Sequence, residues 1–170
     1  MFSYKVIRKI INFGPLFLLY YLSISEIDTY FENLFEILSF NIQLIIIYFW
    51  VSKRPELLGS GHIFFAGLLN DVIMGFPLGL SSLSYLIISL VATYVKNMTV
   101  NTRITTDWFT FFIAIFISNL VFFILLSNFS DITVSITEIS YNTFFTLFFF
   151  PFFWLLFTYY NLIITSGKNA

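Results

Sequence analysis

One acidic residue stands inside a long apolar stretch and is the first candidate for chemistry. Asp71 lies in the run GLLNDVIMG, residues 67–75. Gly67, Asp71 and Gly75 recur at every fourth position, so a helix places them on one face, where small residues let a second helix approach and the carboxylate points into a bundle. An ionisable residue within a membrane is by default a functional hypothesis. We expect Asp71 to be protonated, to be hydrogen-bonded to hydroxyl, amide or backbone groups, or to lie near the outer surface.

Two roles for Asp71 follow from this placement. A lone carboxylate is not an acid/base pair, so we favour a structural clasp between helices over a catalytic or proton-relay role. A clasp predicts that Asp71→Asn is nearly silent, because asparagine keeps a donor and an acceptor. An ion, proton or ligand site predicts instead that the same change abolishes activity.

No other residues form a recognisable catalytic or metal-binding set. The chain has no Cys and a single His, His62, which favours an interfacial or helix-start residue over a metal ligand. There is no Gly-rich phosphate loop, Ser-His-Asp set or HExxH pattern. Asn41, Gln43, Asn119 and Asn142 are explained by interhelical hydrogen bonds. We therefore expect no catalytic residue, no metal, no cofactor and no enzymatic activity.

The composition is that of an integral membrane protein. Of 170 residues, 59% are hydrophobic and 10% charged, with 25 Phe, which is too little polar surface for a soluble domain. The length allows about six helices of roughly 20 residues and no separate soluble domain. We predict an all-α bundle of six transmembrane helices forming one domain over residues 1–170, with residues 144–153 facing lipid. The predicted spans are 6–25, 34–51, 57–74, 78–95, 108–126 and 143–164.

The basic residues predict the topology. All eight Lys and Arg fall in four clusters, at residues 5–9, 53–54, 96–103 and 168, and two crossings fit between successive clusters. The positive-inside rule then places every cluster, and both termini, in the cytoplasm. The clusters are too small for nucleic-acid binding.

Two turns are specified by Gly and Pro. Pro55 ends the second helix at or before Arg54, because the residue ahead of a proline is driven out of the α region. Gly75 suits the left-handed position after the third helix, and Pro77 suits the first turn of the fourth. Residues 75–77 are therefore predicted to join an antiparallel hairpin.

Three segments resemble the MreD family of bacterial rod shape-determining proteins. The first is the Arg-Pro-Glu turn of Arg54, Pro55 and Glu56, and the second is the GLLND helix with Gly67 and Asp71. The third is a Gly-x-Pro-Leu-Gly turn. Its residues are Gly75, Pro77, Leu78 and Gly79. The resemblance is strongest over about residues 50–85.

The resemblance implies a multi-pass protein of the bacterial inner membrane with a fold similar to the substrate-binding subunits of energy-coupling-factor transporters. It implies a scaffold of the cell-elongation machinery that binds MreC and couples cytoplasmic MreB filaments to peptidoglycan synthesis. RodZ, RodA and a class B penicillin-binding transpeptidase are implied as direct or indirect partners, and membrane lipid as the surroundings.

A second function stays open from the residues themselves. A small-molecule-binding subunit of an energy-coupling-factor-type transporter would need convergent polar groups in a cavity that opens outward, and Asp71 near the outer end of its helix keeps this alternative in view. An intramembrane enzyme acting on lipid is disfavoured, since only one deep carboxylate and one His are present.

Overall fold

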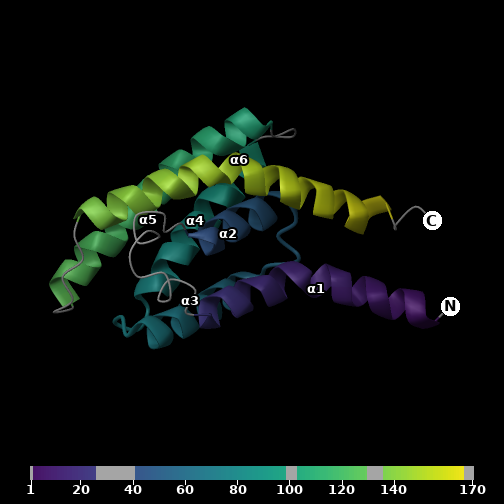
Figure 1. The fold of residues 1–170 in the computed structure, drawn as a ribbon, viewed down its shortest axis with the longest axis horizontal. Coiled ribbons are helices and arrows are strands. Elements are labelled where there is room, and N and C mark those ends of the chain that lie inside the picture. The colour runs from purple at the N-terminus through teal and green to yellow at the C-terminus, as the bar shows by residue number, and fades with distance from the viewer. Residues whose placement is uncertain (1, 26–40, 99–102, 130–135, 167–170) are drawn as a thin grey trace.

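The described part of the chain is entirely helical. The computed structural model describes residues 2–25, 41–98, 103–129 and 136–166, with side chains from residue 12 onward. These ranges contain six helices and no strand, so the all-α prediction is confirmed (Figure 1). The helices are α1 (Phe2–Ile24), α2 (Ile42–Lys53), α3 (Ser60–Met74), α4 (Leu80–Met98), α5 (Ile104–Phe129) and α6 (Ile136–Ser166).

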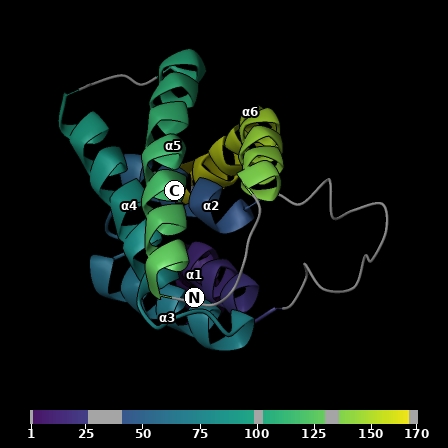
Figure 2. The ribbon, with the colours of Figure 1, turned by 90° about the vertical axis from the view of Figure 1, so that its left-hand side faces the viewer.

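Helix α2 is the centre of the bundle. Its residues from Leu44 to Ser52 are all buried, and α1, α4 and α6 pack around it (Figure 2). The sequence of α2, IQLIIIYFWVSK, is apolar on every side, and its neighbours in the bundle cover all of its faces from Leu44 to Ser52. The aromatic core forms where Tyr48 meets Phe111 of α5 and Phe150 of α6, whose two rings stack at 4.4 Å.

The outer faces of α5 and α6 carry large apolar side chains. Phe144, Phe148 and Phe152 recur at every fourth position of α6 and are all exposed. Both helices are long and apolar enough to cross a membrane, which α2 and α3, with 12 and 15 residues, are not by length. The prediction that residues 144–153 all face outward is wrong for Thr146 and Phe150, which are fully buried because they lie on the side of α6 that faces the core.

Several helix boundaries differ from the predicted spans. Helix α2 begins at Ile42 rather than near residue 34, because the Asn41 side chain accepts the N–H of Leu44 and caps the helix. Residues 34–40 of that span lie outside the described part of the chain. Helix α6 begins at Ile136, so part of the stretch between the predicted spans 108–126 and 143–164 is helical.

Helices α1 and α6 run along the long axis of the molecule, and α5 crosses it obliquely (Figure 1). Figure 1 shows both chain ends at one end of the long axis, on the side of the α2–α3 turn, and we name this the terminal end. The α3–α4 turn, the last turn of α5 and the first turn of α6 lie toward the opposite end, which we name the hairpin end.

Candidate functional site

The Arg-Pro-Glu segment forms the tight turn between α2 and α3. Helix α2 ends at Lys53, and the N–H of Leu57 donates to the carbonyl of Arg54 at 3.0 Å. Pro55 occupies the second position of this turn, where its fixed φ is favourable. The predicted stop at Pro55 is confirmed.

An ion pair closes this turn. The Nε of Arg54 lies 2.9 Å from Oε1 of Glu56, whose side chain is 59% exposed. Partial burial alone raises the pKa of Glu56, but hydrogen bonds from its own backbone N–H and from Arg54, with the charges of Arg54 and Lys96, together hold that pKa below its ordinary value. The carboxylate is thus favoured in the folded turn.

Gly67 is the point of closest approach between α3 and α4. A Cβ at this position would lie 2.4 Å from the Cα and 2.5 Å from the backbone nitrogen of Ser82. Beside this contact the Ser82 hydroxyl donates to the backbone carbonyl of Phe64 at 2.9 Å, so a side-chain hydrogen bond also links the two helices. The structure thus brings α4 close to the small-residue face of α3.

Asp71 joins the end of α3 to the start of α4. Its side chain is fully buried; Oδ2 accepts the N–H of Gly79 and Oδ1 accepts the N–H of Ser81, both at 2.8 Å. These N–H groups lie at the start of α4, where no carbonyl of the preceding turn is available and a negative charge is favoured. The Asp71 carbonyl also accepts the N–H groups of Gly75 and Phe76, which closes α3.

This geometry changes the expectation for Asp71→Asn. Of the environments considered for Asp71, the structure shows backbone hydrogen bonds to both oxygens. Asparagine has one side-chain oxygen, so one of the two N–H donors would face an NH₂ group. The substitution should therefore destabilise the hairpin rather than pass unnoticed.

The α3–α4 turn is longer than the predicted three residues. Gly75 has φ of 68° at the C-cap of α3, which confirms its left-handed position. Pro77 lies ahead of α4 rather than in its first turn, and its carbonyl accepts the N–H of Leu80 at 3.2 Å. Gly79 has φ of 100°, a conformation that residues with a Cβ rarely adopt. Leu78 between them is 72% exposed.

Buried and half-buried amides link neighbouring helices. The Gln43 side chain donates to the carbonyl of Leu22 at 3.0 Å and to Oδ1 of Asn70 at 3.3 Å, and Asn70 in turn donates to Oγ of Ser81 at 3.0 Å. These bonds connect α1, α2, α3 and α4. Between α5 and α6, Asn119 donates to Oγ1 of Thr143 at 2.6 Å. Interhelical hydrogen bonds at Gln43 and Asn119 are therefore confirmed.

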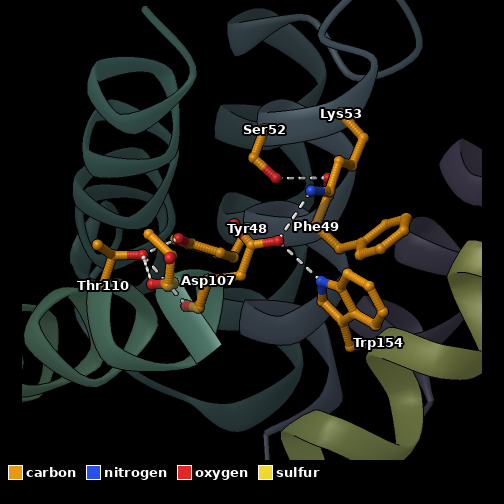
Figure 3. Close-up of polar contacts among 8 residues, drawn as sticks. Tyr48, Phe49, Ser52, Lys53, Asp107, Thr110 and Trp154 are labelled. Carbon is orange, nitrogen blue, oxygen red and sulfur yellow. Dashed lines mark hydrogen bonds and ion pairs between the residues drawn. The ribbon is translucent and has the colours of Figure 1, made fainter. Parts of the chain in front are cut away.

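A second polar cluster lies where α2, α5 and α6 meet (Figure 3). Nζ of Lys53 and Nε1 of Trp154 both lie 2.8 Å from Oδ2 of Asp107, and the ammonium is 5.6 Å from the centre of the indole ring. The hydroxyls of Tyr48 and Thr110 are hydrogen-bonded beside them. Asp107 is fully buried, while the Lys53 side chain is 19% exposed.

The sequence analysis did not identify Asp107 or Trp154. The available signal was Asp107 directly ahead of an apolar helix, a position that an acid favours because of the helix dipole. From the sequence, Lys53 was used only to predict the membrane topology, whereas in the structure it forms an ion pair with Asp107, which lies far along the chain. The second carboxylate oxygen of Asp107, Oδ1, is buried and has no hydrogen-bond partner among the described residues.

His62 is placed at the exposed start of α3, where Nδ1 lies 3.1 Å from the hydroxyl of Tyr20. Among the described side chains, no group of three or more His, Cys, Asp or Glu is close enough to hold a metal ion. The contact joins α1 to α3 at the end opposite Asp71.

The chain matches no protein-family model, no curated protein and no solved structure. A functional assignment therefore depends on the residues and contacts described above.

Proposed function

We propose that this chain is a six-span inner-membrane scaffold of the MreD type, which binds MreC and couples MreB filaments to peptidoglycan synthesis. The observation that carries the proposal is the unit formed by residues 54–79. Its three motif segments lie consecutively along α3: the ion-paired Arg-Pro-Glu turn at one end, Gly67 against α4, and the turn held by Asp71 at the other end. These residues build a rigid hairpin, as a scaffold requires.

The arrangement of the helices supports a multi-pass membrane topology. Helices α5 and α6 meet the length and composition needed to cross a bilayer, and they expose phenylalanine and leucine over most of their length. The chain ends and the α2–α3 turn lie at the terminal end, on the side that the basic clusters assign to the cytoplasm. Because other helices enclose it, the shorter α2 can belong to a membrane bundle without facing lipid.

The topology can be tested with single cysteines, because the natural chain has none. Ser60 and Asn128 are both exposed, Ser60 next to the α2–α3 turn and Asn128 at the hairpin end of α5. In intact spheroplasts an impermeant thiol reagent should label Asn128→Cys and leave Ser60→Cys unmodified until the membrane is opened. The reverse pattern would reject the topology.

The function can be tested by affinity purification of the chain from its native membrane. Co-purification of MreC, and its loss in a Leu78→Asp variant that is inserted in normal amounts, would support the scaffold. Leu78 is suitable because it is exposed on the motif turn and makes no core contact. Purification without MreC at normal membrane abundance would refute the proposal.

A second candidate function is a small-molecule-binding subunit of an energy-coupling-factor-type transporter. The observation that favours it is a pocket of about 250 Å³ at the hairpin end, lined by amides and hydroxyls from five helices. In the same purification this candidate predicts co-purifying ATPase subunits in place of MreC.

A further inference from the structure

The pocket at the hairpin end joins polar residues that the sequence leaves far apart. Its wall includes Asn41 at the N-cap of α2, Gln43 of α2, Asn70 of α3, Asn119 of α5 and Asn142 of α6. Three of these amides, Gln43, Asn70 and Asn119, already bond neighbouring helices, yet all five also line one space. Its volume of about 250 Å³ corresponds to roughly eight water molecules at their volume in the liquid.

One hydroxyl of the wall lacks a partner. Ser84 of α4 lines the pocket and is 5% exposed, and its Oγ has no hydrogen-bond partner among the described residues. Burying a hydroxyl without a partner costs free energy, so such groups commonly bond a ligand or ordered water. In this pocket a bound molecule would supply the partner.

The charges around the pocket select the class of molecule. Among the described residues no Lys or Arg lines it, and the one ionisable carboxyl of its wall, that of Glu138, belongs to the exposed first turn of α6. Phe76 and Phe122 meet edge to face at 5.5 Å and give the wall an aromatic side. An anion would enter without a counter-charge and meet a carboxylate, whereas neutral donors and acceptors match the amides and Ser84.

We infer that this pocket binds a small uncharged molecule with several hydrogen-bonding groups, of about the size of a nucleobase or a monosaccharide, and excludes anions. Pockets between the helices of a bundle that combine an apolar wall with a few convergent polar groups are typical ligand sites. The inference does not require that the chain bind MreC or an ATPase, because it concerns the chain alone.

The test uses the purified full chain with Ser84→Cys as its single thiol. Two reagents of similar size are compared, uncharged 2-hydroxyethyl methanethiosulfonate and anionic 2-sulfonatoethyl methanethiosulfonate. For each reagent, the rate of modification of the folded protein is divided by its rate on the unfolded chain. This relative rate should be at least about tenfold higher for the uncharged reagent, which corresponds to a barrier difference of roughly 1.4 kcal/mol. Equal relative rates, or no modification by the uncharged reagent, would overturn the inference.

Ser89→Cys is the matched control, since Ser89 is buried in the same helix and does not line the pocket. It should resist both reagents; modification as fast as that of Ser84→Cys would mean that unfolding exposes the thiol, and would also overturn the inference. Binding is separated from access by adding glycerol, glucose, uracil or uridine at millimolar concentration. At least one of these compounds should slow modification of Ser84→Cys. If none of them does, the pocket holds only water and the inference is refuted.

Discussion

Replacing Gly67 by alanine should force α3 away from α4. The added Cβ would stand 2.4 Å from the Cα of Ser82, and both atoms belong to helix backbones that cannot move aside as a flexible side chain can. Carbon atoms pack at about 3.5 to 4.0 Å, so the helices must separate by roughly 1 Å or more.

The energetic cost follows from that separation. A gap of 0.5 to 1 Å removes about a quarter to a half of the dispersion attraction of the atoms that face it. Overpacking a tight contact typically costs about 1 to 3 kcal/mol, and the hydrogen bond from Ser82 to Phe64 would be strained in addition. Alanine has a higher helix propensity than glycine, which stabilises the variant by about 0.5 to 1 kcal/mol. We expect a net loss of about 2 kcal/mol.

Thermal unfolding of the purified protein in detergent, followed by size-exclusion chromatography of the heated samples, measures this loss. A change of 2 kcal/mol corresponds to roughly 4 to 8 °C for a chain of this length. Gly61→Ala is the matched control, because it lies in the same helix and its Cβ would meet nothing within 4 Å. Equal midpoints for Gly67→Ala and Gly61→Ala would refute the close approach of the two helices.

Three further predictions concern the polar contacts. Asp71→Asn should lower the free energy of unfolding by about 1 to 3 kcal/mol, the range for a buried donor left without an acceptor, and a midpoint equal to that of the natural protein would contradict the double cap. Lys53→Met should destabilise the fold more than Asp107→Leu, because it leaves a fully buried carboxylate without its counter-charge, whereas the lysine left by Asp107→Leu can reach solvent. The double variant should be more stable than Lys53→Met, and a double-mutant cycle measures this difference. Because the pKa of Glu56 is lowered on folding, its stabilising contribution should be complete above the ordinary glutamate pKa and disappear as the pH falls through the lowered value. Glu56→Gln should lack this acid-dependent step in unfolding midpoints measured from about pH 6 to about pH 3; an unchanged pH profile would contradict it.

Local signals in the sequence specified much of the hairpin. Pro55 predicted the end of α2, Gly75 predicted the left-handed cap of α3, and the spacing of Gly67 predicted a face that a neighbouring helix approaches closely. Each of these depends on backbone sterics within a few residues of the chain. The role of Gly79 was missed because two glycines in one turn leave open which of them takes positive φ, and here both do.

Contacts between distant segments were not accessible in the same way. The ion pair of Lys53 with Asp107, and the donation from Trp154, depend on how α2, α5 and α6 rotate against one another. Apolar periodicity cannot give that rotation for these helices, because all three are hydrophobic around most of their circumference. The shared pocket of the amides was missed for the same reason.

The central position of α2 has a consequence for biosynthesis. Its 12 residues span about 18 Å, well short of the ~30 Å hydrocarbon layer, and the neighbours that enclose it include helices made later in translation. Phe49 and Trp50 reach their ring contacts with Phe157 only after α6 has been synthesised. Nascent chains that stop before α6 therefore lack one wall around α2, so in the proposed six-span topology insertion is completed by a late, cooperative assembly step and truncated products should be targets for membrane proteolysis.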